Sequence, residues 1–231
     1  MASIERDVRL LILAASAGSA DAWSYFGFGH AFVANMTGNT VLLGLAVFQP
    51  HGDLLHPVIS LGSYAAGTMI GSLLTAKVQP GMVWSKAISW TLMLEALLLL
   101  AAEAGWIGIH LHISHAPSLE LLLATVAFAI GMQSSAMVQL KIPGIVTTYI
   151  TGTWTTMLGG LVRLARHEKQ EVPGQEVELE KRLGLQAAVL SVYFLSAVLT
   201  GWLFRHAPLA VGVLPGLSVL LVAVHGLIYN D

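Results

Sequence analysis

Residues 32–39 read Phe-Val-Ala-Asn-Met-Thr-Gly-Asn, and residues 146–153 read Val-Thr-Thr-Tyr-Ile-Thr-Gly-Thr. Each stretch lies in an apolar run, and each carries a Thr-Gly pair that interrupts the run. Because glycine permits a bend and threonine can hydrogen-bond the backbone locally, each pair predicts a break in a helix. The alternative is that each pair is the N-cap of a helix, and the two interpretations are compatible. We therefore expect two broken or re-entrant helical elements, at Ala31–Phe48 and Gly144–Leu161.

Longer apolar runs surround these two stretches, and each is long enough to cross a bilayer as a helix. They are Val8–Phe28, Pro57–Ala76, Ala87–Ile109, Leu119–Leu140, Leu183–Phe204 and Leu209–Tyr229. Hydrophobic residues make up 55% of the 231 residues and charged residues 10%, against roughly 25% charged in a soluble domain. The composition predicts an all-α integral membrane protein, with residues 1–231 as a single membrane domain in contact with the lipid bilayer.

Several classes of function are excluded or left without support by the sequence. Eleven Lys and Arg against 13 Asp and Glu give a net charge of −2, which excludes a basic nucleic-acid-binding protein. The absence of cysteine excludes disulfides, a thiolate nucleophile and a cysteine-ligated metal. No Walker A, GxGxxG, GxSxG or HExxH pattern is present, so neither an enzyme nor a bound cofactor is predicted.

The distribution of basic residues favours six membrane spans over eight, because cytoplasmic loops carry an excess of Lys and Arg. Eight complete crossings would divide the 11 basic residues 7 to 4, whereas six crossings with two re-entrant elements leave only Arg205 outside. The favoured topology places both termini in the cytoplasm and makes residues 163–182 a charged cytoplasmic connector. The alternative, eight membrane helices arranged as two parallel four-helix repeats, stays open.

The two halves of the chain, residues 8–109 and 119–229, resemble each other. Three motifs recur in the same order: Ala17-Gly18-Ser19-Ala20-Asp21 with Ile130-Gly131-Met132-Gln133-Ser134, then the two Thr-Gly stretches, then Tyr64-x2-Gly67-x3-Gly71 with Tyr193-x2-Ser196-x3-Thr200. Three spans in each half make the second repeat inverted relative to the first, as in many channels and secondary transporters. The two breaks would then enter from opposite faces and meet near the midplane.

Asp21 followed by the run at 32–39 resembles the signature of the YoaK-like family, and residues 147–153 are similar to the second motif of that family. The likeness extends over essentially the whole chain. This resemblance implies a small bacterial multi-pass protein of the inner (cytoplasmic) membrane, usually with about six spans. It implies no particular substrate.

Asp21 and Glu95 are the ionisable residues that we expect deep inside spans, where such groups are costly and commonly functional. The counterpart of Asp21 in the second repeat is Ser134, so the repeat is asymmetric at a charged position. A carboxyl group removed from water could carry a proton, which makes Asp21, with Glu95 second, the predicted proton-coupling residue. Alternatively, Asp21 hydrogen-bonds Asn39, Thr37 or a helix end and holds the break in shape.

The predicted function is a secondary transporter or channel for a small polar solute or ion, with proton coupling as one open mode. The predicted substrate-binding residues are Asp21, Thr37, Gly38, Asn39, Gln133, Tyr149, Thr151, Gly152 and Thr153. The alternative is a non-transporting membrane sensor or assembly partner whose broken helices are only structural. Outer-face histidines have no known metal-site spacing, so no metal is predicted; a homo-oligomer is left open.

Overall fold

The computed structural model describes residues 2–49, 51–78, 84–140, 148, 150–166 and 175–229. These residues form eight α-helices and one short 3-10 helix, with no strand among them. The all-α prediction is therefore confirmed. The elements are α1 (Ala2–Gly27), α2 (Met36–Ala46), α3 (Leu55–Thr75), α4 (Lys86–His110), α5 (Leu119–Gln139), α6 (Ile150–Ala165), α7 (Gln175–His206), η1 (Pro208–Ala210) and α8 (Val213–Ile228).

Polar side chains fix the start of three of these helices. Asn35 accepts a hydrogen bond from the N–H of Gly38 before α2, Ser85 from the N–H of Ile88 before α4, and Ser118 from the N–H of Leu121 before α5. Each bond satisfies a backbone donor that the first helical turn leaves without a partner. The sequence therefore sets these boundaries locally.

Five helical segments are long and apolar enough to cross a membrane: α3, α4, α5, Val177–His206 of α7, and Pro208–Ile228 containing α8. The first expected span, Val8–Phe28, lies in α1, which is not one of the five. This helix buries both apolar residues such as Leu13 and polar ones such as Ser16 and Ser19. Because these faces of α1 contact protein rather than lipid, the helix can carry polar side chains that lower its hydropathy.

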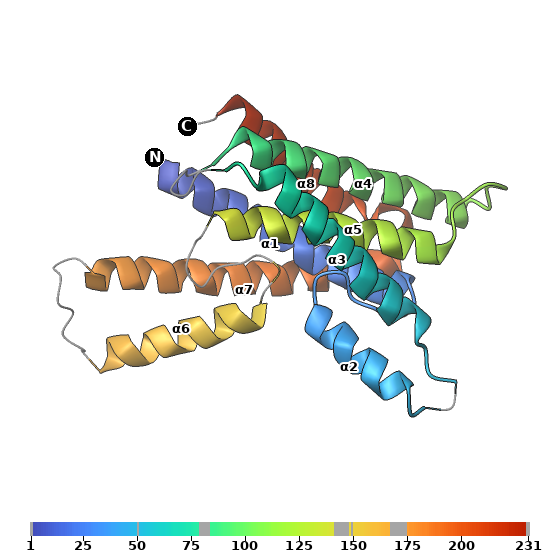
Figure 1. Ribbon diagram of the computed structural model, residues 1–231, viewed down its shortest axis with the longest axis horizontal. Coiled ribbons are helices and arrows are strands. Elements are labelled where there is room, and N and C mark those ends of the chain that lie inside the picture. Colours follow the sequence, from blue (N-terminus) through green and yellow to red (C-terminus); the bar gives the residue numbers. More distant parts are fainter. Residues whose placement is uncertain are drawn as a thin grey trace.

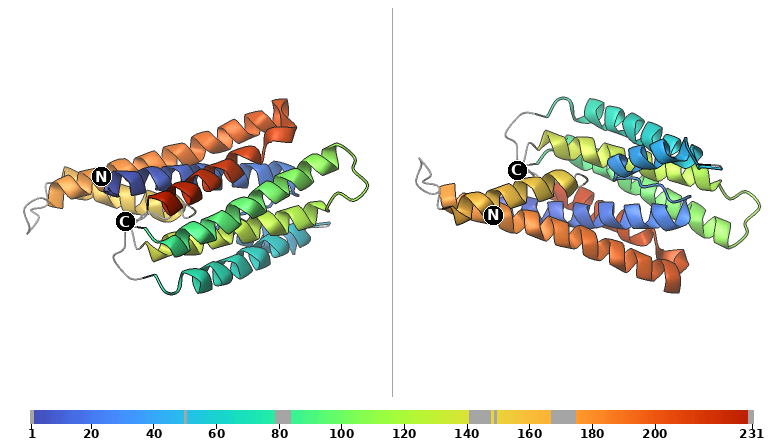
Figure 2. Two further views of the ribbon diagram at one scale, coloured as in Figure 1. Left: turned by 90° about the horizontal axis from the view of Figure 1, so that it is seen from above. Right: turned by 90° about the horizontal axis from the view of Figure 1, so that it is seen from below.

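The helices alternate in direction along the bundle (Figure 1). α1, α4 and α7 run away from the end that holds both chain termini, and α3, α5 and α8 run back toward that end. α1 packs along α7, α3 along α5, and α4 along α8, and the two further views show the same layers of long helices (Figure 2). The shorter α2 and α6 begin near the middle of the bundle and run toward opposite ends.

Two glycines allow the long helices to touch through their backbones. A methyl group on Gly18 of α1 would collide with the carbonyl oxygen of Tyr193 on α7, and one on Gly131 of α5 would collide with the carbonyl oxygen of Tyr64 on α3. Small residues permit such close approach between membrane helices. The two contacts involve residues that the repeat aligns with each other, so both tyrosines are held at matching positions.

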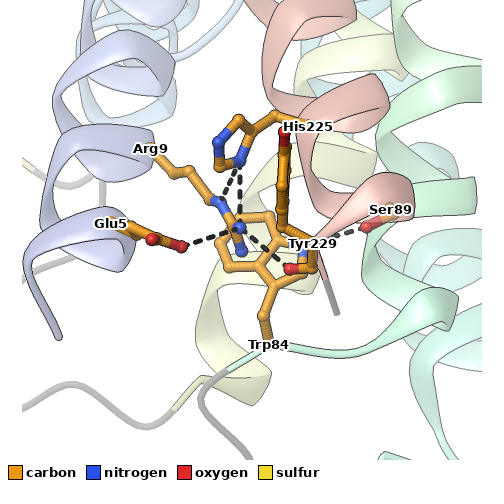
Figure 3. Close-up of polar contacts among 6 residues, drawn as sticks. All are labelled: Glu5, Arg9, Trp84, Ser89, His225 and Tyr229. Atoms are coloured by element: carbon orange, nitrogen blue, oxygen red, sulfur yellow. Dashed lines mark hydrogen bonds and ion pairs between the residues drawn. The ribbon is translucent and has the colours of Figure 1, made fainter. Parts of the chain in front are cut away.

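Arg9 joins the two ends of the chain, as Figure 3 shows. Its guanidinium lies 3.0 and 3.2 Å from Nδ1 of His225 and donates to the carbonyl oxygen of Tyr229 at 3.2 Å. It also lies over the ring of Trp84, 4.7 Å from the ring centroid, while only 5% of Arg9 is exposed. Glu5 completes the cluster at 3.8 Å. The cluster ties α1 to the C-terminal end of α8 and to the segment before α4.

Candidate functional site

A cavity of about 480 Å³ lies between the N-terminal ends of α2 and α6. Its walls come from the short helices α2 and α6, from residues just before them, and from α3, α5 and α7. They are Ala34, Asn35, Met36, Thr37, Tyr64, Ser134, Val138, Thr148, Ile150, Thr151 and Tyr193. Thr37 and Thr151, the threonines of the two Thr-Gly pairs, both line it. The structure therefore brings together two predicted site residues, one from each half of the chain.

Asp21 holds the chain that precedes α2. One carboxylate oxygen accepts hydrogen bonds from the N–H groups of Val33 at 2.8 Å, Ala34 at 2.6 Å and Asn35 at 3.3 Å. The other oxygen accepts the phenolic hydrogen of Tyr193 on α7. Asp21 is 5% exposed. These donors therefore replace the hydrogen bonds to water that the carboxylate loses when it is buried. The side chain shapes the first break through backbone N–H groups, and neither Thr37 nor Asn39 is its partner in these bonds.

Asn39 is fully buried and does not line the cavity. Its side-chain oxygen accepts the N–H of Phe32 at 2.8 Å, and its side-chain nitrogen donates to the carbonyl oxygen of Phe32 at 2.7 Å and to the hydroxyl of Ser60 at 2.9 Å. The amide therefore satisfies both backbone groups of a residue that lies outside regular structure. Asn39, one of the expected solute-binding residues, thus holds Phe32 in the segment between α1 and α2.

Three hydrogen-bonded hydroxyl groups, the last of them on Thr148, lie near the start of α6. Tyr64 on α3 donates to the hydroxyl of Ser134 on α5 at 2.7 Å, and the hydroxyls of Ser134 and Thr148 lie 2.8 Å apart. The arrangement matches that of Tyr193 and Asp21, since the tyrosine again comes from the neighbouring long helix and its partner binds the segment before the short helix. Where the first repeat uses a carboxylate, the second uses a hydroxyl.

Tyr64, Tyr193, Asn35 and Thr148 line the cavity although sequence reasoning did not select them as site residues. A signal was present, because the repeat aligns Tyr64 with Tyr193 and Asp21 with Ser134. The contacts of these residues depend on α1 packing against α7 and α3 packing against α5. Such long-range pairing cannot be read from the spacing of residues within either half.

The remaining predicted residues occupy different positions around the breaks. Gly38 is in the first turn of α2, where its N–H donates to Asn35 at 3.1 Å. Gly152 and Thr153 are in the first turn of α6; Thr153 is buried and neither lines the cavity. Gln133 is buried and donates to the carbonyl oxygen of Leu13 at 3.2 Å. Tyr149 lies outside the described residues.

Glu95 is fully buried on α4 and is not part of the cavity wall. Within the part of the chain that the structure describes, neither of its carboxyl oxygens has a hydrogen-bond partner. Eight residues further along α4, Glu103 accepts the N–H of Gly212 at 3.0 Å. Asp21 and Glu95, the two predicted proton-coupling residues, therefore occupy different surroundings: among the described residues Asp21 bonds the segment before α2, and Glu95 has no such partner.

A second hollow of about 470 Å³ lies on the other side of Tyr193. Asp21, Asn35 and Tyr193 line it together with apolar side chains that include Phe26 and Phe194. Because Asn35 and Tyr193 line both hollows, they form part of the wall between the more polar cavity and the apolar one. The Asp21–Tyr193 hydrogen bond lies at this wall.

The histidine-rich loops provide a polar pair between α2 and α3. Nδ1 of His56 lies 2.6 Å from the carboxylate of Asp53. Partial burial raises the pKa of Asp53, but the hydrogen bonds and charge of His56, with the N–H of Leu55, outweigh it and lower the pKa below its usual value. Among the described residues, no group of three or more His, Asp or Glu side chains is placed to hold a metal ion.

The chain is similar to known protein sequences. It matches the family model described as "Protein of unknown function (DUF1275)" over residues 9–225. It is also 31% identical, over 163 residues, to UPF0700 transmembrane protein YoaK of Bacillus subtilis (strain 168), a match that covers 68% of each chain. No solved structure matches it. The chain thus belongs to the DUF1275 family, and it is a transmembrane protein similar to YoaK.

Proposed function

We propose that this protein is a secondary transporter or channel for a small polar solute or ion, and that the cavity between α2 and α6 is its binding site. The observation that carries the proposal is that Thr37 and Thr151, from equivalent motifs, line one cavity. The cavity also contains the hydroxyl groups of Tyr64, Ser134 and Tyr193. Hydroxyls of this kind bind polar solutes by hydrogen bonds, and irregular backbone at membrane depth is tolerated where it lines a wet cavity.

The proposed topology is six crossing helices with α2 and α6 as two half-membrane elements, arranged as inverted repeats. The helix packing supports it. In the proposed repeats α5 is the counterpart of α1 and α3 is the counterpart of α7, and α1 packs on α7 just as α5 packs on α3. The opposite directions of α2 and α6 support it as well (Figure 1). With the positive-inside rule, the end that holds both termini is assigned to the cytoplasm of a bacterial cell, and the C-terminal end of α6 and the N-terminal end of α7 lie at that end.

Proton coupling, in this proposal, acts through Asp21. Its carboxylate accepts three backbone N–H groups and the hydroxyl of Tyr193. Protonation would remove the negative charge that strengthens these bonds, and it would loosen the segment that positions Thr37. Glu95 remains a second candidate because it is a fully buried carboxyl group on α4. No enzymatic activity is part of the proposal.

Single-cysteine labelling tests the cavity directly, because the chain has no native cysteine. We expect Thr37→Cys and Thr151→Cys to react with a membrane-impermeant thiol reagent in proteoliposomes, since both positions line the cavity. Phe48→Cys, 90% exposed in a loop, is the positive control, and Leu73→Cys, 72% exposed on α3, is the lipid-facing control. If Phe48→Cys reacts but neither threonine position does from either side of the membrane, the cavity is closed and the transport proposal is wrong.

The same labelling tests proton coupling. In the Thr37→Cys background the labelling rate, divided by that of Phe48→Cys at the same pH, should increase as the pH falls, because a protonated Asp21 holds the α2 segment less tightly. The ratio is needed because the reactive thiolate form of any cysteine becomes scarcer at low pH. Adding Asp21→Asn should remove this pH dependence, since an amide does not titrate. A pH dependence unchanged by Asp21→Asn would assign the titration to another group.

The second candidate function is a membrane sensor or assembly partner without transport. It is favoured by the local satisfaction of Asn39, whose amide is paired with Phe32 and Ser60. In that case neither cavity threonine should be accessible to the impermeant reagent. The labelling experiment therefore distinguishes the two functions.

A further inference from the structure

The second hollow, of about 470 Å³, is not used by the proposed solute site. It lies along the contact between α1 and α7, which run side by side (Figure 2), and beside the segment before α2. Most of the described residues that line it are apolar or aromatic, and Asp21 is the charged one among them. The hollow therefore combines an apolar surface with a carboxylate.

Aromatic side chains from three parts of the chain line this hollow. They are Tyr25 and Phe26 of α1, Phe32 of the segment before α2, and Tyr193 and Phe194 of α7. The rings of Tyr25 and Phe32 are stacked, with their centroids 5.1 Å apart. The face of an aromatic ring is electronegative and attracts cations, including quaternary ammonium groups. Rings from separate segments around one hollow therefore favour a cation as its ligand.

Asp21 adds a negative charge whose hydrogen bonds come from neutral groups. Its donors are the N–H groups of Val33, Ala34 and Asn35 and the hydroxyl of Tyr193. In the part of the chain that the structure describes, no Lys, Arg or His forms an ion pair with it. Neutral donors leave the charge of a carboxylate in place, so Asp21 attracts a cation that enters the hollow.

The hydrogen bonds of Asp21 also restrict the kind of cation. A carboxylate has about four positions that accept hydrogen bonds, and the three N–H groups and the tyrosine hydroxyl already use them. A primary ammonium or a guanidinium would find few acceptors for its own N–H groups. A quaternary ammonium or phosphonium carries no such group, and charge and ring faces are sufficient to bind it.

The surroundings of the hollow indicate where its ligand comes from. Phe26, Phe194 and Val198 line it and are exposed. Phe194 and Val198 belong to the stretch Val177–His206, which is long and apolar enough to cross a membrane. Exposed side chains on such a stretch face lipid, so a ligand that enters beside them must be soluble in the hydrocarbon of the bilayer.

We propose that this hollow binds a lipophilic organic cation without N–H groups, a quaternary ammonium or phosphonium. The carboxylate of Asp21 supplies the opposite charge, and the rings around the hollow supply the contact surface. The site differs from the proposed solute cavity in its lining and in its ligand, and it does not depend on transport through that cavity.

Equilibrium dialysis of the purified whole protein in a nonionic maltoside detergent tests the site, with tetraphenylphosphonium as the probe. Tetraphenylborate has nearly the same size and shape but the opposite charge, so it is the matched control ligand. We expect saturable binding of tetraphenylphosphonium that is roughly tenfold or more tighter than that of tetraphenylborate. Equal binding of the two ions would reveal apolar contact alone, and no saturable binding of the cation would mean that the hollow is closed. Either result overturns the proposal.

Variants of the lining test the two contributions separately. Asp21→Asn should weaken binding of the cation by roughly tenfold or more, because it removes the charge and keeps the rings. Phe26→Leu/Phe194→Leu should weaken it by roughly fivefold with Asp21 intact, which keeps the proposal testable if Asp21→Asn does not fold. The matched control, Phe48→Leu/Trp202→Leu, replaces two exposed aromatic residues that do not line the hollow and should bind as the wild type does. Equal loss in the two double variants, or wild-type binding by Asp21→Asn, contradicts the assignment.

A last arm separates a free cation from a lipid headgroup. Phosphatidylcholine carries a quaternary ammonium group and phosphatidylglycerol does not, and we expect neither lipid to displace the bound probe. Displacement by phosphatidylcholine alone would assign the hollow to a lipid headgroup and overturn the free cation as its ligand. Because dialysis measures binding at this hollow, the cysteine labelling of Thr37 and Thr151 remains the separate test of the solute cavity.

Discussion

Tyr193 donates a hydrogen bond to Asp21 across the contact between α7 and α1. The same carboxylate binds the backbone N–H groups of Val33, Ala34 and Asn35. Tyr193 therefore acts on the start of α2 through Asp21, without bonding the broken element itself. Its repeat equivalent, Tyr64, contacts Thr148 through Ser134 in the same way. The segment before α2 is thus connected to α7, and Thr148 before α6 is connected to α3.

Replacing the two tyrosines by phenylalanine should destabilise the protein unequally. Tyr193→Phe removes a hydrogen bond to a carboxylate, for which we expect a loss of about 1.5–3 kcal/mol, whereas Tyr64→Phe removes one between neutral hydroxyls, for about 0.5–1.5 kcal/mol. Unfolding in detergent with increasing denaturant measures both. The two variants remove the same hydroxyl from aligned positions, so each controls for the other. A larger loss for Tyr64→Phe would contradict the role assigned to Asp21.

Glu95 and Glu103 should respond in opposite directions to replacement by methionine. Glu95 is buried without a hydrogen-bond partner among the described residues, so Glu95→Met should raise the free energy of unfolding by about 1–3 kcal/mol. Glu103→Met should lower it, because the buried N–H of Gly212 loses its acceptor. The comparison is made by denaturant unfolding at neutral pH.

A gain in stability accompanied by a loss of pH-dependent activity would mark Glu95 as retained for function, since functional groups are commonly kept at the expense of stability. Destabilisation by Glu95→Met would instead indicate that the carboxyl group stabilises its surroundings.

Arg9→Lys should destabilise the protein although it keeps the charge. A lysine ammonium cannot reproduce the planar contact with Trp84 or donate in the same geometry to His225 and Tyr229. We expect a loss of about 1–3 kcal/mol in the free energy of unfolding. Arg6→Lys is the control on the same helix, because Arg6 is more exposed and, among the described residues, pairs only with the adjacent Asp7. Equal effects of the two changes would show that only charge matters at position 9.

Asp53 should make a small pH-dependent contribution to stability. Its pKa in the folded protein is lowered, despite the opposing effect of partial burial, by hydrogen bonds from His56 and Leu55. A carboxyl group with a lowered folded-state pKa stabilises the protein above its unfolded-state pKa, and this stability is lost as the pH falls through the folded-state value. Asp53→Asn should therefore lower the unfolding midpoint at pH 7 but have no effect in strong acid.

The side chain of Asp53 is 46% exposed, so the difference should shrink when salt is added. A difference that persists unchanged into strong acid would show that the carboxylate charge is not its source.

The sequence was sufficient for the helical class and for membrane-spanning helices, because apolar length is a local signal. The Thr-Gly pairs, from which helix breaks were predicted, lie in the first turns of α2 and α6, and the re-entrant arrangement stays a prediction. We also predicted Thr37 and Thr151 from the sequence, and the structure places them in one cavity. Tyr193 could not be predicted as a site residue from the sequence, because it reaches Asp21 only through the packing of α1 on α7. Asn39 was predicted to bind solute because a polar residue near a helix start can either line a site or hydrogen-bond the neighbouring backbone. The structure shows hydrogen bonds from its side chain to the backbone of Phe32, seven residues earlier, and the spacing of residues alone does not show that contact.

The glycine contacts at Gly18 and Gly131 also limit how the halves can move. At each, a helix backbone rests directly on a carbonyl oxygen of its neighbour, with no side chain between them that could change rotamer. Gly67 and Gly71 of α3 meet the backbone of α5 in the same way, at Phe128 and Met132, so α3 and α5 touch at several points along their length. These contacts leave no room for one helix of a pair to slide along the other, and we expect α3 with α5, like α1 with α7, to move as a single body.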